Sequence, residues 1–378
     1  MRAWIFALSV VAACGRFNFD GHSGSAGDDA PVPDTADPGA TAADFVAAMS
    51  CETDLPIAIV PLVDQLRWLD LGGRQVVFAI YHLDNSHHEL HALVLGTNSG
   101  QIVKVDDVLV YAAPDITGLV AARTPTGMLV FGRDVAGNMV HAIALATSFA
   151  KLGDTPLVGL EDSFEPYAKS DTAQMIAGVT ANGVVAFTVD DLGAATSSTF
   201  VVDTIADSPS HASIAPVGND FLVGWSTGAG TCKFERIDAA GASLAGPLTI
   251  GAPPCSFGSA TAVGSSIVLA FEDPSGPAYA AVTDSTLATS TTPVALGTSP
   301  SYVQELVSYS DHAVIAVSEN MGDSRIVSVA TTGAIMPLGT DFGLTANSSD
   351  HQTASLVAGS LLHARSEGGV LRIRKLCR

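Results

Sequence analysis

Short apolar runs recur along the chain, and each follows a tight turn made of Gly, Asn, Asp, Ser or Thr. The runs are rich in Val, Ile, Ala and Phe, and the runs beside them alternate apolar and polar positions. Alternation with a period of two, in β-branched residues, is typical of β-strands and differs from the helical period of 3.6. The pattern therefore predicts an all-β protein rather than a helical solenoid.

The apolar runs form a repeat, because seven of them end at a bulky or apolar anchor residue. The anchors are Phe78, Phe131, Phe187, Trp225, Phe271, Val317 and Ala364, spaced by 53, 56, 38, 46, 46 and 47 residues. The clearest unit, residues 210–251, contains four strands joined by tight turns, which is typical of a propeller blade. Turns such as Asn182-Gly183 and Asn219-Asp220 precede the anchored run, which we interpret as the second strand of each blade.

We therefore predict a seven-bladed β-propeller over residues 51–378, and we interpret the spacings of 53 and 56 residues as loop insertions. Six or eight blades, or a pair of β-sandwiches, are the alternatives, although sandwiches would not need so regular a period. The repeat carries no signature of the WD, kelch or sialidase type.

The two ends of the repeat region complement each other. The last unit stops one strand short, whereas residues 55–63, LPIAIVPLV, belong to no complete unit. Pro56 and Pro61 are tolerated in an edge strand, so this segment is expected to pair with the last blade and close the ring. The closure would bring Cys51 beside Cys377, and we predict that these two residues form one disulfide and that Cys232 and Cys255 form another.

Composition and charge narrow the classes of protein to which the chain can belong. Of its 378 residues 47% are apolar and 15% are charged, yet no run of about 18 apolar residues occurs, which argues against a membrane-spanning helix. The net charge of −21 argues against nucleic acid and against adhesion to an anionic membrane surface, because both need clustered Lys and Arg. We interpret the acidity as a source of solubility.

The N-terminus predicts export. Residues 1–13, MRAWIFALSVVAA, read as a short signal peptide, with one Arg before an apolar stretch. The tetrad Val11-Ala12-Ala13-Cys14 resembles the lipobox of bacterial lipoproteins. That resemblance implies lipidation of Cys14 and anchoring to the cell envelope, with Gly15 compatible with the outer membrane. An ordinary signal peptide cleaved after Ala13 is the alternative, but lipidation of Cys14 leaves four cysteines that can pair.

Residues 14–50 are predicted to be a disordered linker after the lipid anchor. The segment is rich in Gly, Ala, Pro and Asp, and it contains almost no large apolar residues that could bury surface. Its start, Cys14 to Asp20, followed by such a linker, resembles predicted surface lipoproteins of myxobacteria in composition.

One dense polar cluster is visible, at residues 81–91, YHLDNSHHELH. Histidine and carboxylate groups can hold zinc or copper, so His82, His87, His88 and His91 are the candidate metal ligands. The spacing does not match the zinc-protease helix, because Glu89 does not directly follow His87. A solvated hairpin between the second and third strands of the first blade is the interpretation that we favour, with no metal or other cofactor.

The remaining carboxylates name no catalytic site. Adjacent acids such as Asp106-Asp107, Glu161-Asp162 and Asp190-Asp191 would point to opposite faces of a strand. Glu272-Asp273 and Glu319 follow anchors, where they would either line the rim of the channel or lie in ordinary turns. The leading hypothesis is a non-enzymatic envelope lipoprotein that presents a binding scaffold to a protein or glycan. An envelope enzyme acting on a glycan, with acidic residues at the channel mouth, and a purely structural envelope component are the alternatives.

Overall fold

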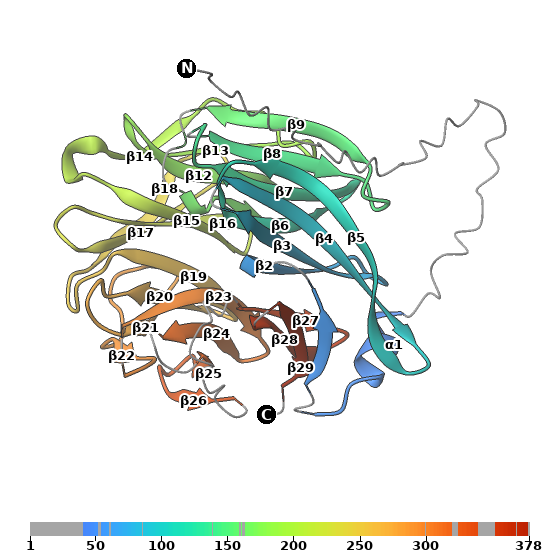
Figure 1. Cartoon of the computed structure of the whole chain (residues 1–378). Coiled ribbons are helices and arrows are strands. Elements are labelled where there is room, and N and C mark those ends of the chain that lie inside the picture. The colour runs from blue at the N-terminus through green and yellow to red at the C-terminus, as the bar shows by residue number, and fades with distance from the viewer. Residues whose placement is uncertain are drawn as a thin grey trace, which may run out of the picture. The chain divides into compact units, whose positions relative to one another are not determined.

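The structure, a computed structural model, describes residues 41–376 except 52–53, 60–61, 85, 138, 159, 161–162, 299, 320–323, 339–351 and 368 (Figure 1). The chain divides into two units, Met1–Ala36 and Asp37–Arg378, and all described residues belong to the second. Cys14 and Cys377 lie outside the described residues.

Seven antiparallel sheets follow one another around a ring, which confirms the predicted seven-bladed propeller (Figure 1). Blade 1 contains β2 Leu62–Asp70, β3 Gln75–Asp84, β4 His87–Asn98 and β5 Gln101–Ala113, and blade 2 contains β6 Ile116–Thr124, β7 Gly127–Asp134, β8 Met139–Leu145 and β9 Lys151–Val158. Blade 3 contains β11 Tyr167–Lys169, β12 Gln174–Thr180, β13 Gly183–Thr188 and β14 Phe200–Thr204. Blade 4 contains β15 Ser210–Val217, β16 Asp220–Ser226, β17 Cys232–Ile237 and β18 Ser243–Ile250. A short strand, β10 Ser163–Glu165, joins the sheet of blade 4.

The other three blades complete the ring. Blade 5 contains β19 Phe257–Val263, β20 Ser266–Glu272, β21 Ala278–Asp284 and β22 Val294–Ala295. Blade 6 contains β23 Ser301–Tyr309, β24 His312–Glu319, β25 Ser324–Ala330 and β26 Ile335–Pro337. Blade 7 contains β27 Gln352–Val357, β28 Ser360–Glu367, β29 Val370–Lys375 and a strand that precedes blade 1 in the chain, β1 Leu55–Ala58. The first strand of blade 7, β27, contacts the first strand of blade 1, β2, so that the ring is continuous.

The second strand of each blade carries the core. In β3, β20 and β24 most side chains are buried, because neighbouring blades cover both faces of the sheet at this depth. A strand that is buried on both faces reads as a continuous apolar run, whereas most residues of outer strands such as β5 and β18 are exposed or half-buried. This difference explains why the anchored runs stood out in the sequence.

The predicted closure is confirmed, with shorter bounds. Strand β1 pairs with β29 in antiparallel register, with Leu55 opposite Ile373 and Ala58 opposite Val370. Pro56 lies on this outer edge strand, where its missing N–H breaks no ladder. The segment predicted as one strand over 55–63 is instead divided between two blades, because β1 ends at Ala58 and Leu62 begins β2 of the first blade.

Blade 3 corrects one anchor. Phe187 is buried but lies on β13, the third strand of its sheet, and the turn at Asn182-Gly183 precedes that third strand. The second strand is β12, which contacts β15 of the next blade as β3 contacts β6 and β16 contacts β19. Ala177, in the middle of β12, lies 46 residues after Phe131 and 48 before Trp225, so the period is regular here and no loop insertion is needed.

The first strand of blade 3 is broken, which hid it in the sequence. Strand β11 pairs with β12 over only three residues, whereas β10, just before Pro166, pairs in parallel with β15 of blade 4. Proline has no N–H to donate, so the chain changes partner there. The spacing of 53 residues between Phe78 and Phe131 instead reflects the long β4–β5 hairpin of blade 1.

The linker predicted over residues 14–50 ends earlier than expected. Residues 42–47 form helix α1, Ala42–Ala47, which begins with a capping box between Thr41 and Asp44. Phe45, Val46 and Met49 join the core between blades 7 and 1, and the Phe45 ring packs edge-on against Trp68 at 6.2 Å between centroids. Burial of these side chains supplies the order that the composition did not predict.

The three cysteines in the described part of the chain are all disulfide-bonded. Cys232 and Cys255 form a disulfide, with 5.5 Å between their Cα atoms, that ties β17 of blade 4 to the segment before blade 5. Cys51 is disulfide-bonded and forms a β-bridge with Lys375, two residues before Cys377 in the chain. Because Cys377 lies outside the described residues, its pairing with Cys51 stays a prediction.

Candidate functional site

The four candidate histidines lie on the hairpin of strands β3 and β4, but they do not form one cluster. Successive residues of a strand face opposite sides of the sheet. His82 and His88 lie opposite each other in register and face blade 2, whereas His87 and His91 lie on the face toward blade 7. The structure therefore divides the predicted cluster into two.

The first cluster joins His82 and His88 to Asp64 of β2. Asp64 Oδ2 lies 3.2 Å from His82 Nδ1 and 3.9 Å from His88 Nε2, and the two imidazole rings lie 4.5 Å apart. His88 is buried, and its Nδ1 accepts the backbone N–H of Ile116 at 3.1 Å. His88 thereby links blade 1 to the first residue of β6 in blade 2.

The second cluster is a line in which basic side chains alternate with carboxylates. Glu89 contacts His87 Nε2 at 2.9 Å through Oε1 and His91 Nε2 at 2.8 Å through Oε2. His91 Nδ1 lies 2.7 Å from Asp107 Oδ1, and Lys104 Nζ lies 2.9 Å from Asp107 Oδ2. The Tyr81 ring stacks on His91, with 4.2 Å between centroids, and the Tyr81 hydroxyl also donates to Asp107.

The second cluster favours the charged form of His91. Burial opposes a charge on the imidazole, but hydrogen bonds to Asp107 and Glu89 outweigh it and raise the pKa of His91. Burial would likewise raise the pKa of Asp107, but hydrogen bonds from His91 and Lys104 lower it to about 2. Because both nitrogens of His91 face carboxylates, both act as donors, and the cluster is a set of ion pairs.

Blade 2 repeats this arrangement, which the sequence analysis missed. His141 Nδ1 lies 2.8 Å from Asp154 Oδ1, and Lys151 Nζ lies 2.7 Å from Asp154 Oδ2. His91 directly precedes the residue that pairs with the anchor Phe78, and His141 directly precedes the residue that pairs with the anchor Phe131. Each Asp lies on the fourth strand of its blade, three residues after the Lys. The shared Lys-x-x-Asp spacing was the available signal.

The blade 2 cluster has the order of a proton relay but not the electrostatics of one. Tyr111 of blade 1 lies 3.1 Å from His141 Nε2, so that Tyr111, His141 and Asp154 form a chain. Burial and the negative charges of Asp134 and Asp154 raise the pKa of the Tyr111 hydroxyl, which works against a nucleophilic phenolate. The chain therefore cross-links blades 1 and 2.

The carboxylates considered for a channel rim make structural contacts. Glu272 Oε1 accepts the Val303 N–H at 2.8 Å, Glu319 pairs with Arg325 at 3.1 Å, and Asp273 caps its own turn through Ser275. Of the adjacent pairs, Asp190 accepts backbone N–H groups in its turn and Asp191 accepts the Gln174 amide at 2.6 Å. Glu161-Asp162 lies outside the described residues.

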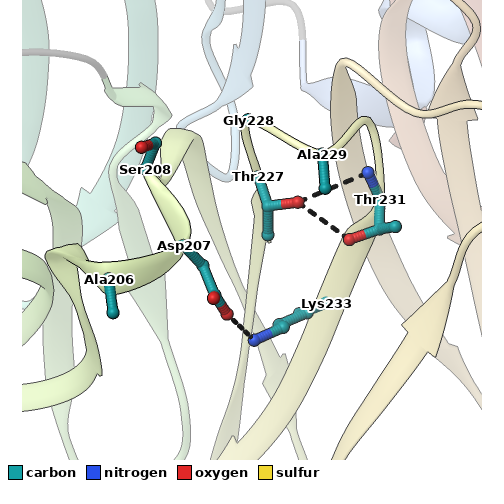
Figure 2. Close-up of a pocket in the computed structure, with 8 residues that line it drawn as sticks. All are labelled: Ala206, Asp207, Ser208, Thr227, Gly228, Ala229, Thr231 and Lys233. Carbon is teal, nitrogen blue, oxygen red and sulfur yellow. Dashed lines mark hydrogen bonds and ion pairs between the residues drawn. The ribbon is translucent and has the colours of Figure 1, made fainter.

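A pocket of about 500 Å³ lies between blades 3 and 4 (Figure 2). The short helix η1, Ile205–Asp207, and the β16–β17 turn form its walls, and its lining residues are Ala206, Asp207, Ser208, Thr227, Gly228, Ala229, Thr231 and Lys233. Lys233 pairs with Asp207 and, at 3.3 Å, with Asp203, so its charge is already neutralised. The pocket lining is mixed, and its polar part offers the hydroxyl groups of Ser208, Thr227 and Thr231 rather than a free cation.

Comparisons with known proteins support the fold alone. No protein-family model and no curated protein matches this chain. Among solved structures, a chain in "Crystal Structure of Mitotic Checkpoint Complex" has a TM-score of 0.55 and 12% sequence identity, covering 87% of this chain and 95% of that one. In all, 773 solved chains match, so the likeness points to a widely used scaffold and selects no function.

None of the helices in the described part of the chain has the length and apolar character needed to cross a bilayer.

Proposed function

We propose that this protein is a lipoprotein of the cell envelope whose propeller is a non-enzymatic binding scaffold for a protein or glycan. The closed ring is the observation that supports the proposal most. The strands are paired within the blades and β1 completes the last blade, so the turns and the connections between blades are the parts of the surface that can vary. In an antiparallel four-stranded blade, the turn between the second and third strands lies at the same end as the connections between blades. We call that side of the ring the connection face.

The connection face carries the features suited to binding. The Asp64, His82 and His88 cluster lies there, beside the β3–β4 turn, and so does the pocket beside Lys233. The hydroxyl groups in the mixed lining of the pocket suit the hydroxyl groups of a glycan or the backbone of a peptide. The carboxylates considered for catalysis are engaged in structural contacts, which favours binding over hydrolysis.

The anchor is the second part of the proposal. Cys14 follows an apolar stretch and small residues, as in the lipobox, and a lipidated Cys14 would tether the propeller to the outer membrane. Cys14→Ser is expected to release the protein from the membrane fraction, whereas Ser9→Ala, in the same signal region, should leave it there. Retention of Cys14→Ser with membranes would disprove the anchor.

Paired substitutions on opposite faces test the binding proposal. Leu83 is 44% exposed beside the β3–β4 turn on the connection face, and Leu356 is 38% exposed near the opposite face. Against a glycan array and envelope proteins, Leu83→Asp is expected to weaken binding at least tenfold and Leu356→Asp to leave it unchanged. Equal losses in both variants, or no binding by the unmodified protein, would contradict the proposal.

A further inference from the structure

The cluster of Asp64, His82 and His88 has the composition of a transition-metal site. Three adjacent strands, β2, β3 and β4, each supply one side chain, and one possible ligand atom from each lies within 4.8 Å of the other two. In the part of the chain that the structure describes, this is the one group of three His, Cys, Asp or Glu residues that meets this geometry. We propose that it binds one zinc-class divalent ion, independently of the anchor and of any partner.

Two of the three ligand distances are close to those of such an ion, and the third, between nitrogen atoms of His82 and His88, lies within 4.8 Å and must shorten on binding. Zinc bonds of roughly 2.0–2.1 Å in tetrahedral geometry place ligand atoms about 3.3 Å apart. Asp64 Oδ2 already lies 3.2 Å from His82 Nδ1, and 3.9 Å from His88 Nε2. Two imidazoles with one carboxylate suit zinc and its neighbours, whereas calcium and magnesium prefer oxygen ligands alone.

The exposure of the cluster leaves room for a fourth ligand. The His88 side chain is 10% exposed and forms the floor, whereas those of His82 and Asp64 are 31% and 28% exposed. Zinc sites with three protein ligands keep a position for water or for a bound molecule. The open side lies on the connection face, so the bound ion would be reachable from solvent.

Binding requires His88 to exchange one hydrogen bond for another. Without metal, Nδ1 accepts the Ile116 N–H, so the ring proton resides on Nε2. A metal at Nε2 moves that proton to Nδ1, which lies 3.4 Å from Asp115 Oδ1. A carboxylate that accepts the second N–H of a ligating histidine is a usual outer partner of zinc sites. Metal binding is thereby coupled to the contact between blades 1 and 2.

The neighbouring histidines provide a matched control. His87 precedes His88 in the chain but lies on the opposite face of β4, in a hydrogen bond with Glu89. His87→Ala therefore removes an exposed imidazole from the same hairpin without touching the proposed site. A nonspecific affinity of the histidine-rich hairpin for metal would depend on His87 as much as on His82.

Isothermal titration with zinc chloride tests the site, using the full chain with Cys14→Ser, free of any histidine tag and stripped with EDTA. We expect one ion per chain, with affinity reduced at least ~10-fold by His82→Ala or Asp64→Asn, as is typical even for the loss of an outer partner. His87→Ala should leave the affinity unchanged.

The titration can also overturn the proposed metal site. Both test substitutions replace partly exposed residues, so the test does not depend on the folding of a variant at buried His88. The absence of saturable 1:1 binding would overturn the proposal. An equal loss of affinity in His87→Ala and His82→Ala would also overturn it, because it would show adventitious binding to the hairpin.

Discussion

Blades 1 and 4 have the same four-stranded topology but are stabilised by different chemistry. Blade 4 has an aromatic core, with Phe221, Trp225 and Phe234 fully buried, and a disulfide from Cys232 toward blade 5, and its ion pairs lie around that core. Blade 1 has an apolar second strand too, but its third strand carries His87, His88, Glu89 and His91 in ion pairs and hydrogen bonds. The repeat thus fixes the second strand, whereas the outer strands are free to differ and to carry polar chemistry.

Removing the central aromatic residue of blade 4 should have the largest effect. Trp225 is 1% exposed, and its indole N–H donates to Asp203 Oδ2 at 3.0 Å. Trp225→Ala is expected to lower the free energy of unfolding by about 4 kcal/mol, from lost burial and the cavity. Urea denaturation measures this, with Val201→Ala on exposed β14 as the control, expected within about 0.5 kcal/mol. A loss below 1 kcal/mol would show that blade 4 is not packed as described.

Loss of the disulfide should have the next largest effect. Cys232 and Cys255 are 23 residues apart in sequence and both are buried. In the chain-entropy model, closing a loop of this length stabilises the fold by about 3 kcal/mol, so Cys232→Ala with Cys255→Ala should lower the free energy of unfolding by that amount. Thermal unfolding of the double variant measures it. An unchanged midpoint would remove the disulfide from the account of blade 4.

In blade 1, the corresponding prediction depends on pH. Asp107→Asn removes the charged acceptor of His91 and Lys104, and is expected to cost about 1 kcal/mol, because the group is partly exposed. The depressed pKa of Asp107 gives stability that is present above its unfolded value, ~3.9, and is lost as pH falls through about 2. The raised pKa of His91 gives stability that is present below ~6.5 and is lost as pH rises through the folded value.

The difference in stability between the unmodified protein and Asp107→Asn should therefore be largest between about pH 4 and 6.5. Urea titrations across the pH range measure it, and the double variant Cys232→Ala with Cys255→Ala should show the same loss at every pH because disulfide-bonded cysteines do not titrate. A loss in Asp107→Asn that does not change with pH would mean that the second cluster contributes packing rather than charge.

Sequence patterns predicted the parts of this fold that depend on burial. The second strands form apolar runs because both of their faces are covered, and the unpaired segment near Cys51 predicted the closure by β1. The prediction that Phe187 anchors a second strand is wrong, because β11 is too short to form a run and the apolar β13 resembles a second strand in the sequence. Helix α1 was missed although Thr41 and Asp44 carry the spacing of a capping box.

The candidate site was only half predictable for a related reason. His82 and His88 stood out because they are close in sequence, but Asp64 reaches them from a neighbouring strand 18 residues earlier. That proximity depends on the register of β2 against β3, which shifts at a bulge between Val63 and Gln65. The division of the histidines between two faces likewise needed the register of β4.

The central claim is that blade 1 carries a metal-binding site, on a scaffold whose blades form the core. Anomalous diffraction at the zinc absorption edge, from crystals soaked in zinc, tests this claim most directly. The account predicts one strong peak between Asp64 Oδ2, His82 and His88 Nε2, with the His88 Nδ1 turned to Asp115. A peak between Glu89 and His91, or no peak on blade 1, would contradict it.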